Sequence, residues 1–104
     1  MFEIGEADVL GQRLRVYVHA PASLRDVWAS TKVHAASTFF VYAGERTTCA
    51  PAHAKVRQLA RHLLDSGVGK GDRVATGMRN YLEWPLAFRA CQSIGAITVS
   101  LNAW

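Results

Sequence analysis

The chain has 104 residues, of which 50% are hydrophobic and 19% are charged, and its twelve Lys and Arg against eight Asp and Glu give a net charge of +4. This length allows at most one domain, and the composition excludes a disordered chain because there are enough apolar residues to build a core. The basic residues are spread among acidic ones from Arg13 to Arg89, so the chain lacks the concentrated basic element that is typical of nucleic-acid binding.

The beginning of the chain predicts a single strand. Residues 1–12 carry no clear pattern beyond glycines that mark turn or flexible positions. Residues 13–19 alternate between apolar and polar side chains, as a half-buried strand does, and Ala20-Pro21 ends the alternation. The apolar face of this predicted strand consists of Leu14, Val16 and Val18.

A short helix and a hairpin are expected next. Ser23 and Asp26 have the spacing of a capping box, and apolar residues follow at helical spacing, which predicts a helix over residues 24–34. Residues 38–48 contain a β-branched and aromatic run that returns after Ala43-Gly44, a pair suited to a tight turn. This pattern predicts a small antiparallel hairpin.

The clearest helix of the first half follows that hairpin. Pro51 fixes its own φ angle and disfavours the α conformation at the preceding residue, so we expect Ala50 at or near the N-cap and Pro51 in the first turn. Gly67 is expected to end the helix in the left-handed conformation, with Val68 folding back onto Leu63. The stripe predicted to face a core consists of Val56, Leu59, Ala60, Leu63 and Leu64.

The next turn contains three glycines around Lys70, a composition shared with phosphate-binding loops. In those loops the glycines follow a strand and open a helix, whose N-terminal N–H groups face the phosphate. Here a helix precedes the glycines and a strand follows, and neither nucleotide-loop spacing fits Gly67, Gly69 and Gly71. The order of elements therefore predicts a structural turn rather than a phosphate site.

The last third of the chain predicts a strand, a helix and a second strand. Residues 73–78 form the first strand, and Asn80 with Glu83 has the form of a capping box for the helix. Pro85 conflicts with that start because it removes a backbone hydrogen bond, so a later start near Trp84 is the alternative. The side of this helix expected to be apolar consists of Trp84, Phe88, Cys91 and Ile94.

Gly95 is expected to end that helix, and residues 96–101 form a β-branched run. A helix of this length is the usual crossover between parallel neighbours, so the two strands should pair in parallel. Such a pair belongs inside a larger sheet that is covered on both faces. The large aromatic residues also exceed what a small unit can bury: Trp28, Phe39, Phe40, Trp84, Phe88 and Trp104. We therefore expect an α/β fragment of a larger fold.

The residues present no evident active site. Structural zinc needs closely paired ligands, whereas the four candidates are scattered: Cys49, His53, His62 and Cys91. A basic set on the long helix is interpreted as a solvated face: His53, Lys55, Arg57, Arg61 and His62. No pair of carboxylates suited to acid–base chemistry is evident. We assign no catalytic, cofactor-binding or metal-binding residue.

The two cysteines and the hydropathy of the chain predict its cellular compartment. Cys49 and Cys91 lie far apart in a chain that does not start with an export signal, which predicts reduced thiols and a cytoplasmic protein. The longest uncharged run, residues 90–104, includes polar residues and is too short for a membrane-spanning helix. No membrane span is therefore expected.

Four motifs in the second half carry a family resemblance. They are Arg57-x-Leu59-Ala60, Gly67-Val68-x-Lys70-Gly71-Asp72-Arg73-Val74-Ala75, Met78-x-Asn80-x-x-Glu83-Trp84, and Gly95-Ala96-x-x-Val99-x-Leu101-Asn102. The stretch from Val56 to Trp104 resembles the N-terminal region of AMP-forming acyl-CoA ligases, in the adenylate-forming superfamily. Its last four residues are similar to bacterial fatty-acyl ligases in particular. Pro51, Pro85 and Ser100 depart from the usual family pattern.

The resemblance implies a protein that uses ATP, Mg and coenzyme A to activate a carboxylic acid, through an acyl-adenylate, and transfer it to the thiol of coenzyme A. The family's phosphate loop, aromatic-Thr-Glu stretch, ribose-binding Asp and catalytic Lys belong downstream of this chain and have no counterpart in it. We therefore expect no catalytic residue here, no cofactor bound by the chain alone, and no turnover.

Taken together, residues 1–104 are expected to be a truncated N-terminal part of an AMP-binding, acyl-CoA synthetase domain. Residues 1–49 form the lead-in strand, helix and hairpin, and residues 50–104 form the helix plus the βαβ unit. The open sheet edge would then meet the remainder of the ligase, or favour self-association. The alternative is a stand-alone binding or regulatory module that pairs this edge with a partner chain.

Overall fold

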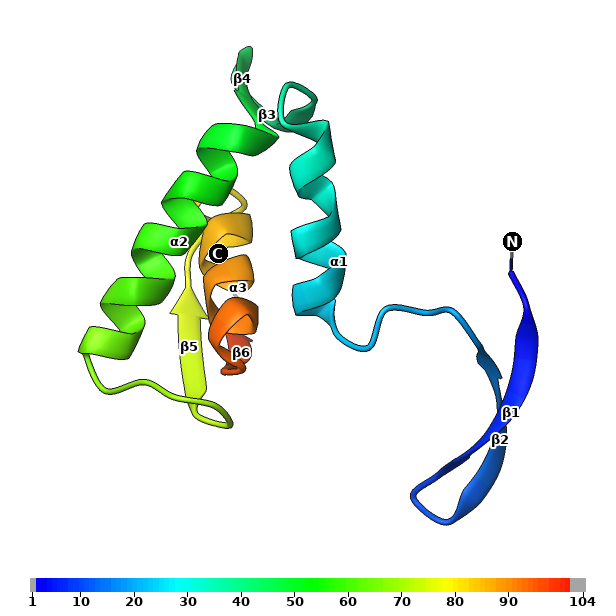
Figure 1. The fold of residues 1–104 in the computed structure, drawn as a ribbon. Coiled ribbons are helices and arrows are strands. Elements are labelled where there is room, and N and C mark those ends of the chain that lie inside the picture. The colour runs from blue at the N-terminus through cyan, green and yellow to red at the C-terminus, as the bar shows by residue number, and fades with distance from the viewer. Residues whose placement is uncertain (1, 102–104) are drawn as a thin grey trace.

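The computed structural model describes residues 2–101, in which helices pack beside short two-stranded sheets (Figure 1). In chain order the elements are β1 (Ile4–Val9), β2 (Gln12–Tyr17), α1 (Leu24–Ser30), the 3₁₀ turn η1 (Thr31–His34), β3 (Thr38–Tyr42), β4 (Glu45–Thr48), α2 (Cys49–Asp65), β5 (Arg73–Gly77), α3 (Glu83–Ile94) and β6 (Ile97–Leu101). The predicted α/β class is confirmed. Trp104, counted among the excess aromatic residues, lies outside the described residues.

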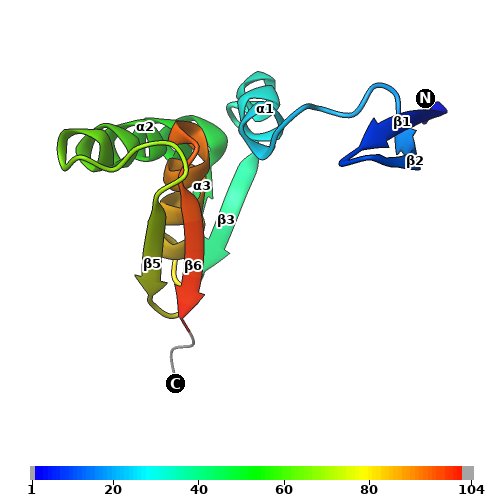
Figure 2. The ribbon, with the colours of Figure 1, turned by 90° about the horizontal axis from the view of Figure 1, so that it is seen from below.

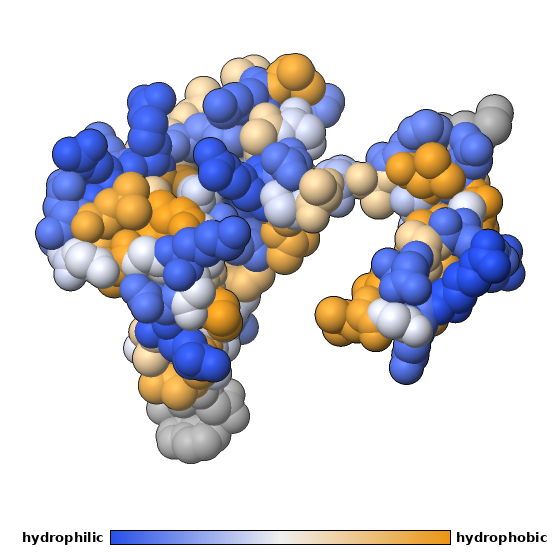
Figure 3. Space-filling model, turned by 60° about the horizontal axis from the view of Figure 1, so that its bottom comes forward, coloured by the Kyte–Doolittle hydropathy of each residue, from blue (hydrophilic) through white to orange (hydrophobic). Residues whose placement is uncertain are grey.

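β1 and β2 form an antiparallel hairpin, although the stretch containing β1 has no clear strand pattern. Ile4 pairs with Tyr17, and the two strands turn at Leu10-Gly11. β2 confirms the predicted strand, but the expectation that its apolar face is half-buried is wrong, since Leu14 is 44% exposed. The connection between β2 and α1 separates the hairpin from the helices (Figures 1 and 3). No helix therefore covers the apolar face of β2.

α1 and η1 together confirm the helix expected over residues 24–34, with the last turn tightened to 3₁₀ geometry. The backbone N–H of Asp26 donates to Ser23 Oγ at 3.2 Å, and the Ser23 hydroxyl donates to Asp26 Oδ2 at 2.7 Å. Thr31 Oγ1 donates to the carbonyl of Trp28 at 2.7 Å. The helix start therefore depends on side-chain capping, which an element of two turns needs.

β3 and β4 confirm the predicted hairpin. Both turn residues have positive φ angles, 49° at Ala43 and 83° at Gly44, as a two-residue type I′ turn requires. The strand register shifts between Thr38 and Phe40, which marks an irregularity in β3. Phe39 from this strand lies edge-on to Trp28, with ring centroids 5.2 Å apart. The hairpin thereby contributes to the core.

α2 begins at Cys49, with Thr48 at its N-cap, so it starts slightly earlier than expected while Pro51 does lie in the first turn. Its end follows the Schellman pattern: the N–H of Gly67 donates to Leu64 O at 2.9 Å and that of Val68 to Leu63 O at 3.0 Å. Gly67 has a φ of 88°. Leu64 is 49% exposed, so the predicted core stripe is wrong at that position.

α3 begins at Glu83, which confirms the later start and shows that Asn80 is not its cap. Pro85 is the third residue of the helix, where its missing N–H has no intrahelical partner to lose. The expected apolar side is confirmed at Cys91, which is buried, and at Ile94, which packs against the core, but the face toward α1 and α2 is centred on Leu86 and Ala90. Trp84 and Phe88 are half-buried and stack on each other, with ring centroids 5.4 Å apart.

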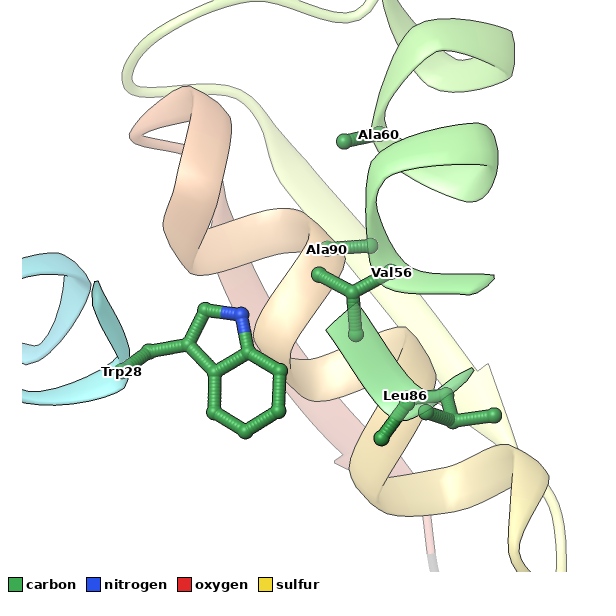
Figure 4. Close-up of a cluster of buried hydrophobic side chains, with 6 residues drawn as sticks. Trp28, Val56, Ala60, Leu86 and Ala90 are labelled. Atoms are coloured by element: carbon green, nitrogen blue, oxygen red, sulfur yellow. The ribbon is translucent and has the colours of Figure 1, made fainter. Parts of the chain in front are cut away.

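The core lies where α1, α2 and α3 meet. Trp28 points from α1 toward α3 and is only 4% exposed, and Val56 projects from α2 into the same space (Figure 4). The buried cluster consists of Trp28, Ala52, Val56, Ala60, Leu86 and Ala90. Three of its six members are alanines, whose small side chains allow α2 and α3 to approach closely. Larger, partly buried hydrophobic side chains pack around this cluster: Phe39, Leu59, Leu63, Leu82 and Ile94.

β5 and β6 pair in parallel, in a register from Arg73↔Ile97 to Gly77↔Leu101. Figure 2 shows the two strands side by side, with α3 behind them. α3 contacts β5, β6, α1 and α2, and thus links the sheet to the helical core. The predicted crossover unit is confirmed.

Candidate functional site

The glycine turn after α2 has no free backbone donors at its glycines. Gly67 N–H donates to Leu64 O at 2.9 Å, Gly69 N–H to Asp72 Oδ2 at 2.8 Å, and Gly71 N–H to Gly95 O at 2.9 Å. A phosphate loop needs such N–H groups to point at the ligand. The residues present therefore do not fit the phosphates of ATP, and the prediction of a structural turn is supported.

The Lys70 side chain packs against Gly95 and does not extend over an open backbone loop. A Cβ built on Gly95 would lie 3.0 Å from Lys70 Cγ, so the lysine stem covers the glycine that ends α3. Gly95 has a φ of 78°, a conformation that favours glycine. The contact between Lys70 and Gly95 thus holds the glycine turn against the C-terminal end of α3.

The residues considered for metal binding or nucleophilic chemistry are not brought together. Cys49 is buried at the start of α2 and Cys91 within α3, both as free thiols. His53 is engaged with α1, and His62 is exposed near the end of α2. Within residues 2–101 no three His, Cys, Asp or Glu residues are placed to hold a metal ion.

His53 corrects the interpretation of one helix face as fully solvated. Its ring stacks on Trp28 with centroids 3.9 Å apart, and its Nε2 lies 2.9 Å from Thr31 Oγ1. Because that hydroxyl donates to Trp28 O, it accepts the hydrogen bond from His53. Burial, and secondly the positive charge of Lys32, lower the pKa of His53 below its ordinary 6.5. No sequence pattern pairs His53 with Trp28, since they lie on different helices.

The candidate functional surface is the β5–β6 face turned away from α3. Side chains alternate along each strand, and the residues on this face are Arg73, Ala75, Gly77, Ile97, Val99 and Leu101. All six are exposed, Ile97 by 48% and Leu101 by 53%. Parallel sheets are normally covered on both faces. Each strand also has one edge without a strand partner among the described residues.

This surface is exposed and presents no catalytic side chains. Its large apolar side chains come from β6, whereas its only charge is Arg73 from β5. The carboxylates flanking the nearby turn are already engaged, Asp65 with Arg61 at 2.9 Å and Asp72 with Gly69 N–H. None of the described helices is long and apolar enough to cross a lipid bilayer.

Comparison with known proteins identifies what the chain is similar to. Residues 27–103 match the family described as AMP-binding enzyme. A medium/long-chain-fatty-acid–CoA/3-oxocholest-4-en-26-oate–CoA ligase of Mycobacterium marinum is 41% identical over 58 residues, which are 56% of this chain and 10% of that protein. The chain thus matches about a tenth of this relative's length.

Solved structures share the fold over most of the chain. A Rhodopseudomonas palustris protein named "putative long-chain-fatty-acid CoA ligase" has a TM-score of 0.72 at 34% identity, covering 77% of this chain and 21% of that one. The NpsA N-terminal subdomain of Klebsiella oxytoca, in complex with 3-hydroxybenzoyl-AMSN, has a TM-score of 0.79 at 21% identity. It covers 85% of this chain and 22% of that one, and at this identity it shows the fold alone.

Proposed function

Because the chain belongs to the AMP-binding enzyme family, we propose that it supplies the N-terminal scaffold of an ATP-dependent, AMP-forming ligase that joins a carboxylic acid to coenzyme A. The observation that carries this proposal is the family match over residues 27–103. In such a ligase the carboxylate attacks ATP, pyrophosphate leaves, and the thiol of coenzyme A then displaces AMP. ATP, Mg and coenzyme A belong to that complete enzyme.

The proposed acid is a fatty acid. Support comes from the names of the Mycobacterium marinum relative and the Rhodopseudomonas palustris structure, which both refer to fatty-acid CoA ligases. Nothing in residues 2–101 forms an acyl pocket next to reactive groups, so the choice rests on similarity alone. Fatty acid metabolism in the cytoplasm is the proposed setting, which suits the free thiols of Cys49 and Cys91.

The proposed role of this chain within the complete ligase is structural. Residues 1–49 form the lead-in and residues 50–104 the helix plus βαβ unit, whose exposed sheet face receives the rest of the ligase. Since the glycine turn cannot hold ATP phosphates, the chain alone should be inactive. ATP–pyrophosphate exchange with Mg and a fatty acid should stay at background, and robust exchange by the 104-residue chain would contradict the proposal.

A chimera tests the scaffold role directly. The 58-residue stretch of the Mycobacterium marinum ligase that matches this chain is replaced by the corresponding residues of this chain. We expect the chimera to retain fatty-acid-dependent exchange, because scaffold residues of one family should be interchangeable. A folded, soluble chimera without exchange would count against the proposal.

The matched control for the chimera is the same protein with Ala90→Asp. Ala90 is fully buried between helices, so an aspartate there would be a buried carboxylate without a partner. Exchange should then be lost together with thermal stability. This control shows whether the assay responds to the packing of the grafted unit.

The second candidate is a stand-alone module that pairs its sheet edge with a partner chain. The exposed β5–β6 face and the unpaired strand edges favour it. Both candidates predict self-association of the isolated chain, measurable by sedimentation. A module should bind a defined partner without restoring exchange, whereas the ligase scaffold should work in the chimera. A clean monomer with cooperative melting would contradict the exposed face as a docking surface.

A further inference from the structure

A groove between α1, α2 and α3 has a cationic rim and an apolar floor. Its volume is about 330 Å³. The floor includes the buried core side chains Trp28 and Val56, and the His53 ring stacks on Trp28 within the same groove. The rim carries Arg25 from α1, Lys32 from η1 and Arg57 from the facing helix α2. The groove has the size of a small-molecule site.

The three rim cations have no carboxylate partner among residues 2–101. The ion pairs of the described chain lie elsewhere, as in Arg61–Asp65 on α2 and Arg13–Glu6 on the hairpin. No acidic residue lines the groove. Three positive charges around one concavity repel each other, and an anion placed among them relieves that repulsion. The charge pattern therefore favours an anionic ligand.

The rim also suggests the form of that anion. Arg25 and Lys32 are seven residues apart, which corresponds to about 10 Å along a helix, and Arg57 faces them from α2. Guanidinium groups bind phosphate in a bidentate manner, and a lysine ammonium adds a point charge. Cations spaced in this way suit a ligand with several phosphate oxygens better than a single carboxylate.

We propose that this groove binds a small molecule bearing phosphate groups. The phosphate contacts Arg25, Lys32 and Arg57, and the less polar part of the ligand lies toward Ala29 and Ile94, which also line the groove. Ser93 on α3 also lines the groove, but its hydroxyl is engaged in a bond to Arg89 O at 2.7 Å. The proposal does not depend on the ligase assignment, because it rests only on the geometry of the helices.

The test is a titration of the 104-residue chain with inorganic triphosphate, followed by the NMR shift of the Trp28 indole N–H and by calorimetry. Saturable binding with a shift at Trp28 is expected. The double variant Lys32→Gln/Arg57→Gln should bind about tenfold more weakly, since hydrogen bonds to charged groups are lost. Both substituted side chains lie on the surface, so the fold should persist, as circular dichroism can check.

The matched control is Arg15→Gln/Lys55→Gln, which removes the same net charge at exposed positions outside the groove. This control variant should change the affinity for triphosphate by less than about twofold, because salt screens charges that lie far from the groove. Equal weakening by both double variants, or no saturable binding to any phosphate probe, would overturn the proposal.

A second arm distinguishes the source of the phosphate. The chain is mixed with phosphatidylglycerol vesicles and with phosphatidylcholine vesicles. Binding only to the anionic vesicles, lost in the groove variant and kept in the control, would identify a lipid headgroup as the ligand. Binding to free triphosphate with the same variant pattern would identify a soluble phosphate compound. Vesicle binding that the groove variant does not alter would count against the groove.

Discussion

The β1–β2 hairpin and the helical unit around Trp28 are stabilised in different ways. The hairpin has a regular strand ladder and an ion pair between Arg13 and Glu6 at 3.1 Å, both side chains being largely exposed. The helical unit buries Trp28 among residues from α2 and α3. In the hairpin, backbone hydrogen bonds are present without a core, whereas the helical unit has both.

This difference shows what a local pattern can and cannot specify. Alternation of apolar and polar residues produces a strand in β2, but it does not supply the element that covers Leu14. An isolated two-stranded hairpin is marginal in water. The free energy of unfolding of this chain should therefore depend on the helical unit and hardly on the hairpin.

The largest expected effect is that of Trp28→Ala. The substitution removes the central side chain of the core, including its contacts with Phe39 and His53, and should lower the free energy of unfolding by about 3–5 kcal/mol. Urea unfolding followed by circular dichroism measures this. Leu10→Ala is the control, because Leu10 is 100% exposed at the hairpin tip. Equal losses in the two variants would contradict the conclusion that the stability depends on the helical unit rather than on the hairpin.

Gly95→Ala should have a smaller effect, about 1–2 kcal/mol, because an L-residue at a φ of 78° is strained. The new Cβ would also lie 3.0 Å from Lys70 Cγ, which the flexible lysine stem can partly relieve. Gly69→Ala is the matched control, since its Cβ would have an ordinary 3.8 Å contact with Asp72 Oδ2. If both variants melt alike, the left-handed conformation is not what holds the turn.

His53 should give the helical unit a pH-dependent stability. Because its folded pKa is lowered, the unfolded state binds more protons just below pH 6.5. Stability should therefore rise as the pH increases toward 6.5 and fall in acid. The positive charge of Lys32 adds to this effect by opposing protonation of His53. In thermal melts across this range, His53→Gln should show a shallower slope; an unchanged slope would exclude His53 as the cause.

The smallest effect is expected for Arg13→Ala on the hairpin. The Arg13–Glu6 pair is exposed, so its loss should change the free energy of unfolding by less than about 0.5 kcal/mol. Raising the salt concentration should reduce even that difference. A loss as large as that of Gly95→Ala would show that the hairpin is coupled to the rest of the fold.

Most of the second half could be predicted from local signals. Gly67 and Gly95 mark helix ends with positive φ angles, and the β-branched run at Ile97–Leu101 pairs in parallel across α3 as expected. Pro85 correctly pointed to a helix start after Asn80. These features follow from the backbone preferences of single residues, which the sequence displays directly.

The remaining features depend on contacts between segments. β1 includes Gly5 and two acidic residues and forms only because β2 pairs with it. The buried face of α3 is centred on Leu86 and Ala90 because α2 packs there, rather than on its larger aromatic residues. The cationic groove joins Arg25 and Arg57 across two helices. Helical periodicity cannot reveal such partners, since it describes one helix at a time.

The parallel pairing of β5 with β6 also has a consequence for the order of folding. Arg73 can meet Ile97 only after the whole of α3 has been formed or at least spanned. Hairpins such as β3–β4 close within microseconds, whereas pairing across a long crossover is slower because it requires a larger loop to close. During synthesis, β5 therefore leaves the ribosome as an unpaired strand and stays without its partner until β6 follows.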